Sequence, residues 1–307
     1  MVCVPIVLSG HIDTVGPDLQ KYETNPYELV VKDGKAYGLG SIDMKSFVAV
    51  ILDNLDKIKR CKQPVVLAFT TDEETNLYCI ENVIEQFKEL KITPKFTIIG
   101  EPTNCEIQTK ANGCYEFEVE VFGKSCHSSK PQNGINAICI MAKIISYIEE
   151  EQQKYQNITA NCGVTTGGDI INRVPDYARL NFDIRGTNMD FIKRFVYNVV
   201  CKIKKLKKEY LGCKITIKKT LEIPPLQDKE NEMINDIAKK LQLKLGEFAG
   251  GCEAGYYQKY SGDAILFGVG DLNLAHKPNE YVVIKEYEYY SRKFLELMSC
   301  LEQELEV

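Results

Sequence analysis

The sequence contains no apolar run close to the roughly 20 residues that cross a bilayer, so we expect no membrane contact. Its 12 cysteines form no Cys-x-x-Cys pair and follow no signal peptide, which favours reduced, mostly buried thiols in a soluble, cytoplasmic protein. Basic residues are scattered except in the run 202–208, which is typical of a solvated helix face. Because the net charge is −5, we expect no nucleic acid partner. Histidine is scarce too, since the chain has three.

The length of 307 residues favours one large domain or two ordinary ones. Up to residue 106, short apolar runs alternate with helical patterns at 44–58 and about 80–90. This alternation predicts an α/β domain with a mostly parallel central sheet and helices on both faces. The same pattern returns after residue 222, and we therefore predict a discontinuous domain of residues 1–106 and 222–307. Its later elements are expected to be a helix at 230–243, a strand at 264–269 and a helix at 286–304.

Residues 107–221 follow a different pattern, in which apolar and acidic residues alternate strictly over 115–121. Such alternation is typical of a half-exposed strand. The order of predicted elements that follows is βαββαβ, which is the ferredoxin-like order. We therefore predict an independent domain inserted into the first one. After the first strand, its elements are expected to be a helix at 134–152, strands at 158–166 and 177–185, a helix at 189–209 and a strand at 214–220.

Three apolar runs end at clusters of acidic residues or histidine. The run VPIVLSG ends at His11 and Asp13, PVVLAFTT at an acidic triplet containing Glu73 and Glu74, and PKFTIIG at Glu101. Ligands of open α/β sheets collect beyond the carboxyl ends of the strands, so these side chains are expected to converge. Converging carboxylates repel one another strongly at about 4 Å in a low dielectric, and bound divalent cations would remove that repulsion.

Two further residues complete the candidate metal site. Asp43 lies at the start of the first predicted helix, in GLGSIDMKS, and His276 follows the apolar run AILFGVG. Taken alone, each motif has a plainer interpretation: His11 with Asp13 as a capped turn, Asp43 as an acid at a helix N-terminus, the glutamate pair as a solvated turn, and His276 as a surface residue. Together they supply the imidazole and carboxylate donors that zinc prefers, with a carboxylate able to bridge two ions.

The motifs in their order resemble a known family. HIDTV, GLGSIDMKS, TDEE, GEPT, HSSKPQNGINAI and AHKPNEY are similar to those of the acetylornithine deacetylase and succinyl-diaminopimelate desuccinylase family, whose members are dinuclear zinc hydrolases. The resemblance covers the whole chain, insert included. It implies two divalent metal ions, with Zn²⁺ the first choice and Co²⁺ or Mn²⁺ as alternatives. One metal would be held by His11, Asp43 and Glu101, and the other by Asp43, Glu74 and His276, with Asp43 bridging.

The resemblance also assigns roles around the metals. Glu73 would be the general base for attack of a metal-activated water on the substrate carbonyl, and Asp13 would support His11. The insert would be a lid and dimerisation domain, so a homodimer is expected. Its His127 would reach the active site of the partner subunit and stabilise the oxyanion. Asn172 and Arg185 match residues that clamp the substrate carboxylate, a task suited to the planar fork of arginine.

These implications predict a hydrolase that cleaves the amide of an N-acyl amino acid, with N-acetylornithine deacetylation in arginine biosynthesis as the first candidate. Glu253 could pair with the cationic side chain of such a substrate. Succinyl-diaminopimelate desuccinylase and a di- or aminopeptidase of the same family are the alternatives. A further alternative, of a different class, is that the chain is an inactive or truncated homologue that serves in binding or oligomerisation.

The chain opens almost directly into an apolar strand of the kind found inside sheets. Members of the family carry several dozen residues before this strand. We therefore expect that a preceding segment is missing, with consequences for stability more than for the chemistry.

Overall fold

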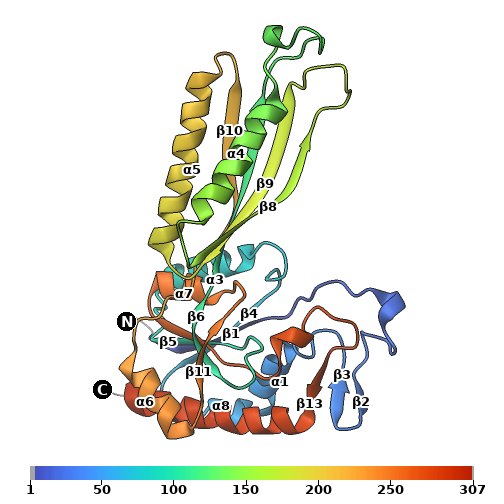
Figure 1. Ribbon diagram of the computed structural model, residues 1–307. Coiled ribbons are helices and arrows are strands. Elements are labelled where there is room, and N and C mark those ends of the chain that lie inside the picture. The colour runs from blue at the N-terminus through green and yellow to red at the C-terminus, as the bar shows by residue number, and fades with distance from the viewer. Residues whose placement is uncertain (1–3, 306–307) are drawn as a thin grey trace. The chain divides into compact units, whose positions relative to one another are not determined.

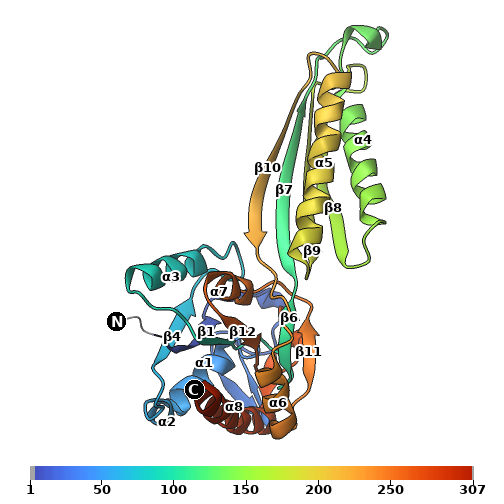
Figure 2. The ribbon, with the colours of Figure 1, turned by 90° about the vertical axis from the view of Figure 1, so that its left-hand side faces the viewer.

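The computed structural model describes residues 4–305, and its chain divides into two compact units (Figures 1 and 2). The first unit runs to Ala111 and resumes at Leu226, and the second is Asn112–Pro225. The boundaries thus differ by a few residues from the predicted 107 and 221. The reason is that residues 107–111 form a strand of the first unit's sheet instead of opening the insert.

The first unit is built on a six-stranded sheet in which most neighbouring strands run parallel. One antiparallel pair, between β6 and β12, interrupts it. Every residue of β1 is buried, because β5 and β4 flank it within the sheet and helices cover both faces of the sheet. In sheet order, the strands are β11 (Leu245–Phe248), β6 (Ile107–Ala111), β12 (Asp263–Leu266), β5 (Phe96–Ile99), β1 (Ile6–His11) and β4 (Val65–Thr70).

Helices cover both faces of this sheet, which confirms the predicted α/β class. Helices α1 (Lys45–Asp53), α6 (Glu232–Leu241) and α8 (Ile284–Leu305) lie on one face, while α3 (Tyr78–Glu89) and α7 (Ala254–Tyr260) lie on the other (Figures 1 and 2). The helix predicted at 44–58 ends early, and a short helix, α2 (Leu55–Ile58), follows it. The side chain of Asn54 donates to the carbonyl of Val50 at 3.0 Å, a local bond that competes with helix continuation.

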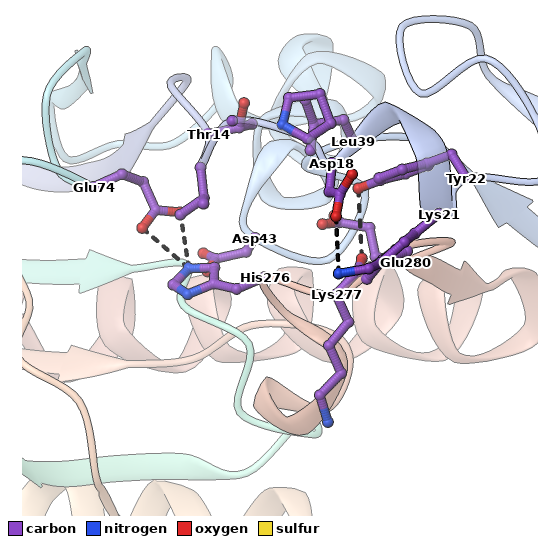
Figure 3. Close-up of a pocket in the computed structure, with 14 residues that line it drawn as sticks. Thr14, Asp18, Lys21, Tyr22, Leu39, Asp43, Glu74, His276, Lys277 and Glu280 are labelled. Atoms are coloured by element: carbon purple, nitrogen blue, oxygen red, sulfur yellow. Dashed lines mark hydrogen bonds and ion pairs between the residues drawn. The ribbon is translucent and has the colours of Figure 1, made fainter.

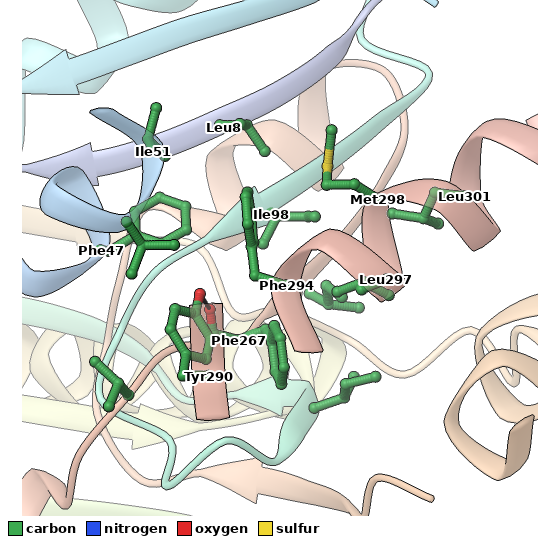
Figure 4. Packing of buried hydrophobic residues seen from close by; sticks show 14 of the residues in the cluster. Leu8, Phe47, Ile51, Ile98, Phe267, Tyr290, Phe294, Leu297, Met298 and Leu301 are labelled. Atoms are coloured by element: carbon green, nitrogen blue, oxygen red, sulfur yellow. Dashed lines mark hydrogen bonds between the residues drawn. The ribbon is translucent and has the colours of Figure 1, made fainter. Parts of the chain in front are cut away.

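The main core lies between the sheet and the helices α1, α6 and α8. Phe47 of α1 meets Phe294 of α8 edge to face, with ring centroids 5.9 Å apart (Figure 4). Tyr290 of α8 packs on Phe267 at 4.9 Å and donates its hydroxyl to the Phe267 carbonyl at 2.6 Å, so its buried polar atom is satisfied. This packing gives the strands a rigid base beneath their carboxyl ends.

A small antiparallel sheet stands beside the main one in the first unit, and the sequence patterns did not predict it. Its order is β13-β3-β2, with β13 (Tyr281–Val283), β3 (Lys35–Tyr37) and β2 (Val30–Lys32). Strands of three residues carry too little periodicity to be recognised. Short 3₁₀ turns occur at η1 (Leu19–Lys21) and η3 (Leu272–Leu274).

The second unit has the predicted βαββαβ order and forms a four-stranded antiparallel sheet in the order β10-β7-β9-β8. On β7 the apolar residues alternate into a core formed with the two helices, as the sequence pattern predicted. A 3₁₀ turn, η2 (Pro131–Asn133), lies in the loop before the first helix. The elements are β7 (Gly113–Phe122), α4 (Ala137–Gln152), β8 (Ile158–Gly167), β9 (Tyr177–Gly186), α5 (Met189–Glu209) and β10 (Lys214–Ile223).

Within residues 4–305, no helix combines the length and the apolar character that a membrane span requires. The 11 cysteines of this range form no disulfide. The expectation that they are mostly buried was wrong, since only Cys114, Cys252 and Cys300 are buried.

Candidate metal centre

The three clusters predicted at strand ends come from three neighbouring strands. In the sheet, β5, β1 and β4 lie side by side and parallel, and the register pairs His11 with Thr70. His11 is the last residue of β1, Glu73 and Glu74 follow β4, and Glu101 follows β5. Parallel strands end at the same edge of a sheet, so their polar side chains meet there.

Two loops bring the remaining side chains to this edge. Asp43 lies two residues before α1, and His276 lies in the loop after η3. In the described chain, two groups of side chains stand close enough to hold a metal ion, with the ligand atoms of each group within 4.8 Å of one another. The first group is His11, Asp43 and Glu101, and the second is Asp43, Glu74 and His276.

The carboxylate of Asp43 belongs to both groups, and each of its oxygens faces a different imidazole. Oδ1 is 3.1 Å from Nε2 of His11, and Oδ2 is 3.2 Å from Nε2 of His276. Glu74 approaches the same Nε2 of His276 at 3.0 Å (Figure 3). A carboxylate with one oxygen toward each group has the arrangement that a bridging ligand requires.

Asp13 contacts the centre from outside it. Its backbone carbonyl lies 3.0 Å from Nδ1 of His11, and its side-chain Oδ2 accepts the backbone N–H of Glu74 at 3.1 Å. With Nδ1 engaged in this way, Nε2 is the nitrogen of His11 that faces the other ligands. Asp13 therefore orients a residue of each group without belonging to either.

Burial and mutual repulsion shift the pKa values of the carboxylates. Burial raises the pKa of Glu73 to about 8, and the charges of Glu253, Glu74 and Asp43 add to the rise. Burial likewise raises the pKa of Glu101 well above its usual value. Acids held together in this way are unfavourable as free anions, and cations of the right size would stabilise all of them at once.

The histidines respond in the opposite way. Burial lowers the pKa of His11, but the hydrogen bond to Asp43 and the surrounding carboxylates outweigh it and raise the pKa to about 11. The hydrogen bond to Asp43 is the largest cause that raises the pKa of His276 to about 9. For Asp43, burial favours the neutral acid, but the two imidazoles outweigh it and lower the pKa to about 2.

The residues present fit a pair of divalent cations. Two imidazole nitrogens and three carboxylates are donors that zinc accepts, and manganese or cobalt accepts the same set. A cavity of about 180 Å³ opens beside Asp43, Glu74 and His276 (Figure 3). Its wall also contains Thr14, Asp18, Lys21, Tyr22, Leu39, Lys277 and Glu280.

Glu253 does not lie on that cavity wall. It is 2% exposed, and its carboxylate accepts hydrogen bonds from the hydroxyls of Ser9, at 2.8 Å, and Thr70. The Ser9 hydroxyl is in turn 2.9 Å from the hydroxyl of Tyr257. This placement contradicts the expectation that Glu253 contacts a cationic substrate, because both of its oxygens are already engaged within the protein interior. Its charge instead acts on Glu73 and Glu101 through the protein.

Of the three predicted residues of the insert, His127 and Asn172 lie in adjoining loops. His127 forms an isolated bridge with Arg173, and the N–H of Ser128 donates to the Asn172 carbonyl at 3.0 Å. Both loops adjoin the end of the sheet where Phe122 pairs with Tyr177. The His127 ring is exposed and 2.8 Å from the hydroxyl of Ser129.

Arg185 lies at the other end of the same sheet. It pairs with Cys114 across β7 and β9, and its Nε donates to Asp183 at 2.9 Å. Eight residues of strand, about 25 Å, separate it from Tyr177. One copy of the unit therefore does not bring Arg185 together with Asn172 and His127.

Sequence reasoning missed Ser9, Tyr257 and Glu280, which are buried next to the predicted residues. Ser9 and Tyr257 lie within ordinary strand and helix patterns, so nothing in the sequence distinguished them. Glu280 had one signal, as an acid directly after the Pro-Asn turn of the quoted motif AHKPNEY.

Comparison with known proteins agrees with the geometry. The family model described as peptidase family M20/M25/M40 matches residues 7–299. Acetylornithine deacetylase of Buchnera aphidicola (subspecies Acyrthosiphon pisum, strain Tuc7) is 32% identical over 293 residues, which cover 90% of this chain and 75% of the relative. Acetylornithine deacetylase of Pasteurella multocida is 31% identical over 292 residues, with the same coverage.

Solved structures share the fold at lower identity. A tripeptidase from Staphylococcus aureus superposes with a TM-score of 0.77 at 23% identity, covering 99% of this chain and 83% of that one. The aminopeptidase PepT of Bacillus cereus gives 0.78 at 20% identity, with 97% and 81% covered. A Bacillus subtilis protein described as a dinuclear metal-binding peptidase gives 0.71 at 17% identity, with 98% and 83% covered.

The pKa shifts predict a pH-dependent stability for the chelator-treated protein. His11, His276 and Glu73 all hold a proton more tightly when folded than when unfolded, so stability is greatest at low pH and falls as pH rises through their folded pKa values. We expect the melting temperature in EDTA, measured by circular dichroism, to fall between pH 5.5 and 8.5. The variant Glu73→Gln should flatten this fall, and saturating Zn²⁺ should reverse it. A melting temperature in EDTA that rises steadily over this range would contradict the assignment.

Proposed function

The chain belongs to peptidase family M20/M25/M40, a family of metallohydrolases, and from that membership we propose that it removes the acyl group of an N-acyl amino acid. The observation that carries this proposal is the carboxylate of Asp43 shared between two ligand groups, each with its own histidine. The preferred substrate, N-acetylornithine, is supported by the names of relatives at 31–32% identity that align over 90% of this chain.

We propose that His11, Asp43 and Glu101 hold one divalent cation and Asp43, Glu74 and His276 a second, with Zn²⁺ as the first choice. Bound there, such cations polarise an amide carbonyl and lower the pKa of water. Asp13 keeps His11 and the backbone of Glu74 in place. With five protein ligands for two ions, open positions remain for water and substrate.

Glu73 is proposed as the general base. It directly precedes Glu74 in the turn after β4, belongs to neither ligand group, and is buried close enough to His11, Glu74 and Asp43 for their charges to shift its pKa. Burial lifts the pKa of Glu73 toward neutrality, the range in which a carboxylate both accepts a proton and passes it to a leaving amine.

The alternatives differ in substrate more than in chemistry. The fold is shared with a tripeptidase and an aminopeptidase, so a peptide bond is a competing target for the same centre. A desuccinylase remains an alternative within the family. Apart from the candidate metal ligands Asp43 and Glu74, the cavity wall carries two acids, Asp18 and Glu280, and two cations, Lys21 and Lys277, which favours no single substrate charge.

We further propose that the protein is a cytoplasmic homodimer joined through the second unit. Arg185 and His127 lie at opposite ends of one sheet, about 25 Å apart along the strands. A substrate the size of an amino acid cannot touch both residues of one copy. They can serve the same substrate only if two copies contribute them.

A substrate panel tests the function. The zinc-loaded protein should hydrolyse N-acetylornithine with a kcat/KM at least about tenfold above that for N-acetylcitrulline, succinyl-diaminopimelate or dipeptides. Chelation should abolish the activity, and Zn²⁺ or Co²⁺ should restore it. Faster cleavage of a dipeptide would replace the deacetylase by a peptidase, and no turnover of any panel member with two cations bound would favour the inactive homologue.

The two adjacent glutamates should have separable roles. Glu73→Ala should keep both metals but lose about 100- to 10,000-fold in kcat, because it removes the base alone. Glu74→Ala should first lose metal affinity, measured by calorimetric titration with Zn²⁺. Asp56→Ala, which changes an exposed acid of α2, is the control. Equal metal loss in the two site variants would contradict this division.

Complementation tests the role of His127. Chains carrying His127→Ala are mixed with chains carrying Glu73→Ala, and exchange of subunits is followed by native mass spectrometry. If His127 acts on the partner's substrate, half of the dimers regain one of two sites, or about one quarter of the wild-type activity. Confirmed exchange without recovery would show that His127 does not act in the partner's site.

A further inference from the structure

Within the described residues, the loop that carries Asp43 pairs with no strand of the main sheet, although its Ile42 and Met44 are buried in the core beside that sheet. Residues 38–44 lie between β3 and α1, outside every strand, and Gly40 takes a positive φ of 76° that other residues rarely adopt. Asp43 nevertheless has to present one oxygen to each of two histidines. Hydrogen bonds to the loop backbone add to the packing of Ile42 and Met44 in setting its position.

Glu280 supplies such contacts from the far end of the sequence. Its carboxylate accepts the backbone N–H of Ile42 at 3.0 Å, and the amides of Asp43 and Gly40 also face it. Its own backbone carbonyl accepts the N–H of Gly38 at 3.3 Å. The bonds thus span the whole loop, and Glu280 is 4% exposed.

The same short segment also carries a metal-site histidine. His276 lies four residues before Glu280, and β13 begins directly after Glu280 and pairs with β3. Glu280 therefore fixes the Asp43 loop to the segment that presents His276. In the second group, Asp43 and His276 thus lie on two segments that the side chain of Glu280 joins.

Asn279, the residue directly before Glu280, makes similar hydrogen bonds to a different loop. The side chain of Asn279 accepts the N–H of Glu23 at 2.8 Å and donates to the carbonyl of Lys21 at 3.4 Å. Lys21 and Tyr22 line the cavity but offer no ligand to either metal group (Figure 3). Asn279 thus holds the cavity wall, whereas Glu280 holds the metal loop.

The chemistry of Glu280 is costly for a merely structural residue. A buried carboxylate must be compensated by hydrogen-bond donors, and here it also lies near the charge of Asp43, which repels it. Backbone amides pointing at a carboxylate form strong, directional bonds that fix their own orientation. An acid at this place is therefore explained by the demand for a firmly held loop.

We propose that Glu280 is a positioning residue that sets the shared carboxylate of Asp43 relative to His11 and His276, and so controls the affinity for both cations. The inference rests on the proposed function, because it takes Asp43 to be a ligand of both ions. A competing role exists, since Glu280 also lines the cavity and could bind a cationic substrate group directly.

Three substitutions of Glu280 separate the effect of side-chain length from that of charge. Glu280→Gln keeps an oxygen at the right distance from the Ile42 amide but removes the charge. Glu280→Asp keeps the charge but is one methylene too short, and Glu280→Ala removes both. Asn279→Gly is the matched control, because it removes the neighbouring bonds to the cavity wall and glycine accepts the positive φ of 62° at that position.

The readout is calorimetric titration of the chelator-treated chain with Zn²⁺, together with the visible absorption spectrum of the Co²⁺-loaded protein. Glu280→Ala and Glu280→Asp should weaken the binding of both cations by about 10- to 100-fold and alter the Co²⁺ spectrum. Glu280→Gln should retain the spectrum and lose much less affinity. Asn279→Gly should bind both cations as the wild type does, and change KM for the substrate instead.

Several outcomes would overturn the proposal. Wild-type cation affinity in Glu280→Asp would show that the length of the side chain is irrelevant. Equal losses of cation affinity in Glu280→Gln and Glu280→Ala would show that charge alone matters. Unchanged cation binding in all three, with KM raised only for cationic substrates, would assign Glu280 to substrate binding. If circular dichroism shows that Glu280→Ala does not fold, the cation affinities of Glu280→Asp and Glu280→Gln still test the proposal.

The measurement also separates this inference from the proposed function. Wild-type protein that binds two cations but hydrolyses no substrate of the panel would overturn the deacetylase and leave the role of Glu280 standing. Wild-type protein that binds no cation would overturn both.

Discussion

The structure depends on the convergence of like charges at one edge of a parallel sheet. Three neighbouring strands end there in His11, the Glu73–Glu74 pair and Glu101, and the Asp43 loop adds another carboxylate between two imidazoles. No arrangement of these acids is favourable without compensation, and their raised pKa values express that cost. The apolar packing of α1 and α8 beneath the edge supplies the rigidity that holds such groups together.

The edge is surrounded by polar residues that fix its geometry without belonging to it. On one side, Glu253 joins the ends of β1 and β4 through the hydroxyls of Ser9 and Thr70. On another, Glu280 holds the loop of Asp43. Both are nearly fully buried acids, so each adds to the repulsion that the site already contains. Their retention is understandable if exact placement of the donors matters more than the free energy of unfolding.

The fold class and the clustering of the candidate ligands could be predicted because each signal was local, whereas the division of the ligands into two groups came from the resemblance to a known family. A buried strand followed directly by acids, as in β1 and β4, predicts where those acids lie once parallel pairing is assumed. Glu253 was placed wrongly because its partners, Ser9 and Thr70, lie more than 180 residues away along the chain. The strands β2, β3 and β13 were missed for a different reason, since three residues show no periodicity.

The two ligand groups at this edge of the sheet cannot by themselves select a substrate. Two histidines and a few carboxylates activate the amide of an acyl amino acid and that of a peptide in the same way, and proteins with this fold are named for several substrates. Selection must come from groups that touch the rest of the substrate. On the cavity wall Lys21 and Tyr22 are such groups, and the proposed function gives the same role to the loops of His127 and Asn172. The cavity wall at Lys21 is held by Asn279, which lies three residues after His276 and directly before Glu280, so the short segment 276–280 supports both the cavity wall and the metal groups through different side chains.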